Sequence, residues 1–239
     1  AYDAHIGRQH DGVVKVIDAY ESYFPASPRE SIDPFHQDSK YRERRQTVFV
    51  MPAYDHDVKW LMRLRAECPE DFPAEQRTSI CKDVFRGLAY LHGVDIMHRD
   101  IKPANIFVRF GKVVRAVIGD VGLGAMVPSS AAGEAHTAHV CSDGYVAPEL
   151  LLGRSHRDGS AVYGRPVDVW SAGVVTFEVA TMSAFLSPGV INLEGIARRI
   201  GQAPPEYGRI GAAADGLEAS LTGLWLPIVV MCLNWRPEL

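Results

Sequence analysis

A polar octapeptide at residues 98–105 gathers several side chains that could do chemistry together. It reads His-Arg-Asp-Ile-Lys-Pro-Ala-Asn. Asp100 offers a carboxylate, Lys102 an ammonium group and Asn105 a carboxamide. These groups could act as a base, a stabiliser of negative charge and a metal ligand. The octapeptide therefore predicts a site for a phosphate-bearing substrate.

The segments on either side of the octapeptide predict the elements that hold it in place. Upstream, Pro73 and Glu75 suit the first turn of a helix, whose free N–H groups favour a proline and a carboxylate. Apolar residues then recur with a period of about 3.6 and form one buried face. They are Ile80, Cys81, Val84, Phe85, Leu88 and Leu91. Downstream, residues 106–109 and 113–118 are largely apolar and predict a hairpin that turns at Gly111.

Two further strands and two further helices are predicted. Residues 13–17, followed by Tyr20, Tyr23 and Phe24, are β-branched and aromatic, which favours a strand, and the apolar residues 47–51 predict a second one. Residues 25–45 between them are rich in charge, proline and serine, and predict an exposed insertion. Residues 58–64 predict a short helix. Residues 168–179 are apolar on nearly all sides, so we expect an enclosed helix around which other elements pack.

Two long stretches in the second half have weaker patterns. Residues 123–146 carry few bulky apolar side chains, which predicts a long irregular segment without elements of its own. Residues 191–233 predict at least two surface helices separated by a proline-containing loop.

The composition restricts the classes of function. The chain has 239 residues, of which 47% are hydrophobic, and this is enough for a substantial core. Its 25 basic and 29 acidic side chains give a net charge of −4, which lacks the basic excess typical of nucleic-acid binding. No apolar stretch reaches the ~20 residues that cross a bilayer. We therefore expect no nucleic-acid partner and no membrane segment.

The four cysteines indicate a reducing compartment. They stand far apart and form no C-x-x-C pair, so neither a zinc finger nor a disulfide framework is expected. They are Cys68, Cys81, Cys141 and Cys232. The N-terminus shows no signal peptide. Reduced, buried thiols and a cytoplasmic location are the simplest interpretation.

Three more motifs follow the octapeptide in a characteristic order. Asp120 stands in a D-x-G, residues 147–149 read A-P-E, and residues 168–173 read D-x-W-S-x-G. This order and spacing resembles the protein kinases, and the lysine two residues after Asp100 resembles their serine/threonine branch. The A-P-E and D-x-W-S-x-G motifs distinguish the chain from small-molecule phosphotransferases of similar fold. The resemblance implies an α+β, two-lobed kinase fold over essentially the whole chain.

The resemblance implies a role for each polar group of the site. Asp100 would be the catalytic base, and Lys102 would neutralise charge on the γ-phosphoryl group in transit. Asn105 and Asp120 would hold Mg²⁺, which prefers oxygen ligands. The implied cofactors are therefore ATP and Mg²⁺, and the implied partner is a protein substrate with a serine or threonine hydroxyl.

The resemblance also places the nucleotide pocket. Residues 13–20 and 47–51 resemble the fourth and fifth strands of the upper lobe, and residues 52–55 resemble the hinge. Met51 would guard the back of the pocket, and Phe107 would form part of its floor beneath adenine. The expected nucleotide-binding residues are Met51, Pro52, Ala53, Tyr54 and Phe107.

Further residues would support the site or regulate it. Arg99 would receive a phosphate placed on the segment between residues 120 and 149, and Thr137 is the first choice of acceptor. Tyr145 would belong to the substrate-facing loop. The expected structural residues are His98, Arg99, Ser142, Glu149 and Asp168. Among them, Ser142 would bond the catalytic aspartate and lysine, Asp168 would accept backbone N–H groups of the catalytic loop, and Glu149 would pair with an arginine.

The sequence departs from the kinase pattern in two respects. Val121 replaces the phenylalanine of D-F-G, which is expected to loosen the switch between active and inactive states. No glycine-rich loop or third-strand lysine precedes the first strand. We expect residues 1–54 to be a partial upper lobe with its hinge, and residues 55–239 a lower lobe truncated near its end. Such a fragment is expected to be inactive by itself. The alternative function is a pseudokinase or scaffold that binds proteins.

Overall fold

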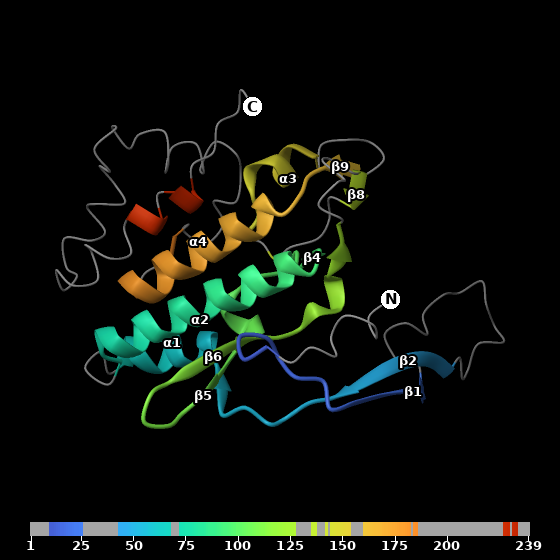
Figure 1. Ribbon diagram of the computed structural model, residues 1–239, viewed down its shortest axis with the longest axis horizontal. Helices are drawn as coiled ribbons and strands as arrows, with labels where there is room; N and C mark the ends of the chain where they lie inside the picture. Colours follow the sequence, from blue (N-terminus) through green and yellow to red (C-terminus); the bar gives the residue numbers. More distant parts are fainter. Residues whose placement is uncertain are drawn as a thin grey trace, which may run out of the picture. The chain divides into compact units, whose positions relative to one another are not determined.

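The computed structural model divides the chain into two units (Figure 1). The first unit comprises Ala1–Gln9 and Lys15–Ala53, and the second comprises His10–Val14 and Tyr54–Leu239. The structure describes residues 10–25, 43–67, 72–127, 135–137, 142, 144–153, 160–182, 184–185, 227–229 and 231–233. The predicted division into a partial upper lobe and a lower lobe stays a prediction.

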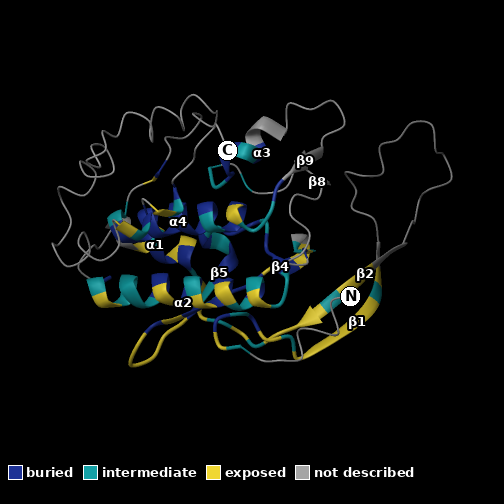
Figure 2. Ribbon diagram, turned by 45° about the horizontal axis from the view of Figure 1, so that its top comes forward, coloured by how far each residue is buried: buried dark blue, intermediate teal, exposed yellow. Residues whose placement is uncertain are grey.

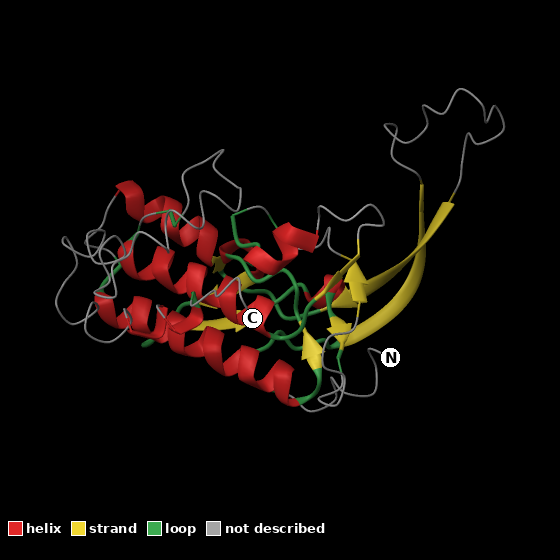
Figure 3. Ribbon diagram, turned by 90° about the horizontal axis from the view of Figure 1, so that it is seen from above, coloured by secondary structure: helices red, strands yellow, loops and turns green. Residues whose placement is uncertain are grey.

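The described part of the first unit is a two-stranded antiparallel ribbon (Figure 3). Strand β1 (Asp18–Pro25) pairs with β2 (Glu43–Val50), with Asp18 opposite Val50 and Pro25 opposite Glu43. Much of the ribbon is exposed (Figure 2), including Tyr20 and Tyr23. Most of the predicted insertion, residues 26–42, lies outside the described residues.

The strand predicted from Val13 through Phe24 is present but starts later than expected, because β1 begins only at Asp18. Val14 instead packs into the second unit, where its N–H donates to the Ile118 carbonyl at 2.8 Å. The backbone of Gly12 makes this possible by lying directly against α2. A Cβ built on Gly87 would come within 2.2 Å of the Gly12 carbonyl oxygen, so only two glycines can pack this closely.

Helices dominate the second unit (Figure 3). Helix α1 (Val58–Glu67) and helix α2 (Ala74–Gly93) confirm two sequence predictions. Glu75 lies in the first turn of α2 as expected, whereas Pro73 lies one residue before the helix, at its N-cap position. Helix α4 (Pro166–Thr181) lies beside α2 (Figure 1). The two run antiparallel, since Arg77 near the start of α2 donates to the Ala180 carbonyl near the end of α4 at 3.0 Å.

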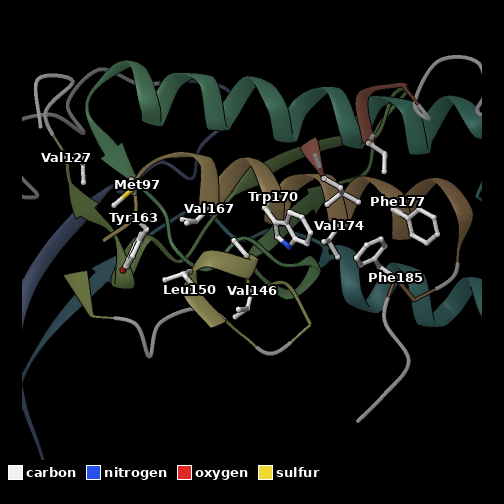
Figure 4. Packing of buried hydrophobic residues seen from close by; sticks show 13 residues of the cluster. Met97, Val127, Val146, Leu150, Tyr163, Val167, Trp170, Val174, Phe177 and Phe185 are labelled. Atoms are coloured by element: carbon white, nitrogen blue, oxygen red, sulfur yellow. The ribbon is translucent and has the colours of Figure 1, made fainter. Parts of the chain in front are cut away.

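Helix α4 is the centre of the core, as its apolar sequence predicts. All of its residues from Trp170 to Ala180 are buried (Figure 2). Phe177 and Trp170 pack edge-on against Phe185, with ring centroids 5.4 and 6.5 Å apart (Figure 4). The same cluster takes in Met97, Val127, Val146, Ala147, Leu150, Tyr163, Val167, Val174, Val229 and Leu233.

Small sheets complete the second unit. Strands β3 (His56–Asp57), β5 (Ile106–Arg109) and β6 (Arg115–Ile118) form one antiparallel sheet. The predicted hairpin is confirmed, although its second strand begins two residues later than expected because Val113 is exposed in the turn. The short 3₁₀ helix η2 (Pro103–Asn105) lies within the octapeptide.

The stretch at residues 123–146 is less irregular than predicted. A 3₁₀ helix, η3 (Val121–Leu123), is followed by β7 (Ala125–Met126), which pairs with β4 (Ile96–Met97). Further on, β8 (Ala135–Thr137) pairs with β9 (Ser160–Val162), and α3 (Pro148–Gly153) follows the site. Strands of two or three residues are too short for a sequence period to reveal.

The surface helices predicted within residues 191–233 fall largely outside the described residues, which show helical turns at 227–229 and 231–232. Among the helices that the structure describes, none combines the length and apolar character needed to cross a bilayer.

Candidate active site

The buried carboxylate of Asp168 fixes the start of the octapeptide. Its Oδ2 accepts the His98 N–H at 2.8 Å, and its Oδ1 accepts the Arg99 N–H at 2.7 Å. The Nε2 atom of His92 lies 2.9 Å from the same Oδ2. Asp168 is fully buried in the first turn of α4, where the helix dipole favours a negative charge. These bonds hold Arg99 in the left-handed region, at φ 67°.

The His98 ring connects the octapeptide to the D-x-G motif. His98 is fully buried, its Nε2 lies 2.8 Å from the Gly119 carbonyl, and its Nδ1 accepts the Asp100 N–H at 3.2 Å. A carbonyl can only accept and a backbone N–H can only donate, so the ring carries its proton on Nε2. The Gly119 N–H in turn donates to the Asn105 carbonyl at 2.8 Å. The two motifs are thus held together from both sides of Gly119.

The carboxylate of Asp100 is the centre of the site. Its Oδ2 accepts from Lys102 Nζ at 2.6 Å and from Asn105 Nδ2 at 2.9 Å. Its Oδ1 accepts from the Ser142 N–H at 3.0 Å and from Ser142 Oγ at 2.9 Å. Burial alone would raise the pKa of Asp100, but the bonds from Lys102, Ser142 and Asn105 outweigh it and hold the pKa below its usual range. The carboxylate is therefore ionised at neutral pH.

Lys102 and Ser142 complete a closed set of contacts. Lys102 Nζ also donates to Ser142 Oγ at 2.6 Å, so the ammonium group bridges the aspartate and the hydroxyl. Ser142 lies 42 residues from Asp100 in the sequence, and the structure brings the two together as the sequence predicted for this residue. The arrangement fixes one carboxylate and one cation side by side in a partly buried site.

Asn105 and Asp120 are suited to a cation that is also bound by phosphate. Asn105 Nδ2 donates to the Asp100 carbonyl at 2.8 Å, so the amide presents its Oδ1 as the possible metal ligand. Asp120 is exposed and left-handed, at φ 54°. Within the described residues no three His, Cys, Asp or Glu side chains form a metal cage. This donor set fits Mg²⁺, which typically takes one or two protein oxygens together with phosphates and waters.

The predicted nucleotide-binding residues fall into both units. Met51, Pro52 and Ala53 follow β2 in the first unit. Tyr54 and Phe107 belong to the second unit, where their rings stack with centroids 5.6 Å apart. This pair forms an aromatic surface, and its assignment to adenine stays a prediction.

Arg99 reaches toward the segment that follows Asp120. Its guanidinium donates to Tyr163 Oη and to the Gly124 carbonyl, each at 3.5 Å. Thr137 is described only as part of the backbone of β8. Its relation to Arg99 therefore stays a prediction.

A model of the protein kinase domain matches residues 4–200, which is most of the chain. The chain belongs to the protein kinase domain family. It is 29% identical over 170 residues to protein kinase gsk31 of Schizosaccharomyces pombe, covering 71% of this chain and 38% of that protein. It is 31% identical over 144 residues to cyclin-dependent kinase B2-1 of Arabidopsis thaliana, covering 60% and 43% respectively. The chain thus spans about two fifths of the length of these two kinases.

The fold of this kinase domain also resembles a solved structure, the yeast RNA Pol II CTD kinase CTDK-1 complex. The TM-score is 0.58 at 24% identity, and the match covers 81% of this chain and 55% of that one. At this identity the likeness shows the fold alone. Together with the family match, it confirms the predicted α+β kinase fold.

Several residues that shape this kinase domain were not singled out from the sequence. Glu178 is a buried carboxylate on α4 that accepts the Tyr145 hydroxyl at 2.7 Å and the Phe185 N–H at 3.2 Å. Burial raises the pKa of Glu178, and burial beside that carboxylate raises the pKa of Tyr145. The signal was present, because Glu178 is a lone acidic residue in an otherwise apolar run.

Glu149 of the A-P-E motif is partly buried. Burial raises the pKa of its carboxyl group. Among the described side chains, none pairs with Glu149, so its pairing with an arginine stays a prediction.

Proposed function

We propose that this chain is the catalytic part of a serine/threonine protein kinase, which transfers the γ-phosphoryl group of ATP to a protein hydroxyl. The observation that carries the proposal is the ionised carboxylate of Asp100, held by Lys102, Asn105 and Ser142. A surface aspartate in a turn has no reason to gather three such partners. A catalytic base needs such partners, because it must stay ionised beside the negatively charged phosphoryl group that is being transferred.

The proposed reaction assigns a task to each of these groups. The hydroxyl oxygen of the substrate attacks the γ-phosphorus, the bond from that phosphorus to the β–γ bridging oxygen breaks, and ADP leaves. Asp100 orients the hydroxyl and accepts its proton, while Lys102 neutralises charge on the γ-phosphoryl oxygens. Ser142 keeps both groups in place through its bonds to each.

Asn105 and Asp120 would hold Mg²⁺. When bound, the cation neutralises charge on the nucleotide phosphates. Asn105 is oriented for this task by its bonds to Asp100, and Asp120 by the backbone link through Gly119. The stacked rings of Tyr54 and Phe107 would receive the adenine. The resemblance adds Met51, Pro52 and Ala53 to the expected nucleotide-binding residues.

The same proposal includes a phosphorylation site, a class of partner and a cellular location. Thr137 is proposed as a phosphorylation site whose phosphate pairs with Arg99. The partner is a protein substrate, and the net charge of −4 argues against nucleic acid. An intracellular, cytoplasmic location is supported by Cys81 and Cys232, which are free thiols.

A kinase assay on the full-length protein tests the proposal, with wild type and Asp100→Asn compared on a serine- and threonine-containing substrate. We expect Asp100→Asn to lower kcat by a factor of about 10² to 10⁴, the usual contribution of a general base. Asp18→Asn is the control, because the exposed carboxylate of Asp18 accepts only the neighbouring Ala19 N–H among the hydrogen bonds of the described residues. Equal phosphate incorporation by wild type and Asp100→Asn would contradict the enzymatic proposal and favour the scaffold alternative.

Nucleotide binding by the full-length protein provides a separate test of the metal ligands. We expect Asp120→Asn to abolish the magnesium-dependent part of ATP binding, measured by titration calorimetry with and without Mg²⁺. Binding that keeps the same magnesium dependence would remove Asp120 from the proposed site.

A further inference from the structure

An ion pair joins the end of α2 to the start of α4. Asp95 follows α2 and is left-handed, at φ 61°, with its N–H donating to the His92 carbonyl at 3.2 Å. Arg165 directly precedes Pro166, the first residue of α4. The Arg165 guanidinium donates to the Asp95 carboxylate. The pair lies close to the His92–Asp168 contact, because both connect the same two helix ends.

The pair also holds both backbone groups of Val127. The Val127 N–H donates to the Asp95 carbonyl at 2.7 Å, and the Val127 carbonyl accepts from Arg165 Nη2 at 3.1 Å. The nitrogen that bonds this carbonyl is the same one that bonds the Asp95 carboxylate. The Val127 side chain is buried in the core cluster beside these ends (Figure 4). One residue is thus held by its N–H, its carbonyl and its side chain.

Val127 ends the part of the segment after Asp120 that the structure describes continuously. It directly follows β7, which has only two residues and pairs with a strand of the same length. A two-residue pairing contributes little stability by itself. The contacts of Val127 with Asp95 and Arg165 extend that pairing by one residue and connect it to the two central helices.

The charges alone do not explain the arrangement. The Arg165 side chain is 28% exposed and the Asp95 side chain 40% exposed, and ion pairs at such sites are weak. The geometry is more informative, because one guanidinium nitrogen of Arg165 donates to both a carboxylate and a backbone carbonyl. Its effect is to fix a position in the chain rather than to stabilise the whole fold.

We propose that Asp95 and Arg165 form an anchor that fixes the segment after the D-x-G motif at Val127. Through β7 the anchor limits the freedom of Gly124, whose carbonyl accepts from Arg99. Asp120 precedes Gly124 by only four residues, so the anchor also limits where this aspartate can lie. Asp95 and Arg165 are therefore positioning residues, and their effect on phosphoryl transfer rests on the proposed function.

Amide hydrogen exchange, followed by NMR on this chain, tests the anchor without requiring catalysis. We expect Arg165→Gln and Asp95→Asn each to speed exchange of the Val127 N–H by about three- to tenfold, the range for losing one modest hydrogen bond. Asparagine tolerates the left-handed backbone at position 95, so the second variant removes charge without backbone strain. Arg165→Lys keeps the charge and is expected to fall between wild type and Arg165→Gln.

Two controls show whether the effect is local. The Ile118 N–H, which donates to the Gly12 carbonyl in the same unit, should exchange at the wild-type rate in all variants. Arg86→Gln removes another surface arginine and should leave the exchange rate of the Val127 N–H unchanged, since Asp83 keeps its bonds to Arg115.

The double variant Asp95→Asn with Arg165→Gln should speed exchange of the Val127 N–H by less than the product of the two single changes.

Unchanged Val127 exchange in both single variants overturns the anchor, as does equal acceleration at Val127 and Ile118. In the full-length protein, the positioning role predicts that Arg165→Gln lowers kcat and that Arg165→Lys restores part of it. An active wild type whose kcat is unaffected by Arg165→Gln overturns that role. A wild type without kinase activity contradicts the proposed function alone, because the exchange result is independent of it.

Discussion

The ring of Phe107 occupies the space in which a side chain at Gly119 would stand. A Cβ built on Gly119 would lie 2.2 Å from Cε2 of that ring, far inside van der Waals contact. The same ring is stacked against Tyr54. The aromatic surface proposed for adenine therefore depends on a glycine directly before Asp120, the proposed metal ligand.

Replacing this glycine should displace the ring. We expect Gly119→Ala to destabilise the fold by about 1–3 kcal/mol, the usual effect of overpacking. It should also weaken Mg²⁺–ATP binding, because Phe107 must move. Urea denaturation and titration calorimetry measure the two effects. Adding Phe107→Leu to Gly119→Ala should restore stability, since the smaller side chain makes room. A single variant as stable as wild type would contradict the steric argument.

The buried Asp168 should be among the least replaceable side chains of the site. Asparagine keeps one acceptor oxygen for two backbone N–H groups, so Asp168→Asn leaves one of them facing an NH₂ group. We expect a loss of about 2–4 kcal/mol in the free energy of unfolding, measured from the urea midpoint. Asp57→Asn is the matched control, because Asp57 accepts the Trp60 N–H at an exposed helix start and asparagine caps as well. Equal effects of the two substitutions would argue against a special role for Asp168.

Local sequence patterns correctly predicted the helices that carry a long apolar pattern and pack in the same way along their whole length. Helix α2 has one apolar face over 20 residues, and α4 is apolar on all sides because it is enclosed. The octapeptide is a contiguous motif, so its side chains could be assigned together. The contact between Asp100 and Ser142 came from a family resemblance, since nothing in the local sequence places residues 42 positions apart side by side.

The features that were missed depend on contacts between distant segments. Val14 looked like part of a strand but packs against β6, because Gly12 and Gly87 allow a close approach to α2. The pair of Asp95 and Arg165 joins residues 70 positions apart, and neither stands in a recognisable motif. Such pairs follow from the antiparallel packing of α2 and α4, which a single sequence does not reveal.

The lowered pKa of Asp100 predicts a defined dependence of stability on pH. A carboxyl group whose pKa is lower in the folded protein than in the unfolded chain stabilises the fold above its unfolded pKa. That contribution disappears as the pH falls through the folded pKa. The stability advantage of wild type over Asp100→Asn should therefore be largest near neutral pH and shrink below pH ~4, where aspartates ordinarily titrate.

Lys102→Met tests whether the ammonium group of Lys102 is what lowers the pKa of Asp100. Removing the ammonium group should raise the pKa of Asp100 and reduce the pH dependence of stability in the acid range. Urea midpoints measured at several pH values compare the pH dependence of stability of wild type, Asp100→Asn and Lys102→Met. A wild-type advantage over Asp100→Asn that stays constant down to strongly acidic pH would show that the carboxylate is not stabilised by its neighbours.

Glu178 predicts the opposite dependence, because burial raises its pKa. A carboxyl group of this kind stabilises the fold below its unfolded pKa, and the contribution is lost as the pH rises through the folded pKa. Glutamine at this position still offers an oxygen to the Tyr145 hydroxyl but no charge to bury. The stability of Glu178→Gln relative to wild type should therefore increase from the ordinary glutamate range upward, by up to about 1 kcal/mol for each unit by which the pKa is raised.

The control for this last prediction is Glu75→Gln at the exposed first turn of α2, which should show no such trend. Urea denaturation of wild type and both variants at several pH values measures how the relative stability of each variant depends on pH. A Glu178→Gln variant whose relative stability falls as the pH rises would mean that the charged carboxylate is favoured by its partners, the Tyr145 hydroxyl and the Phe185 N–H, more than burial disfavours it.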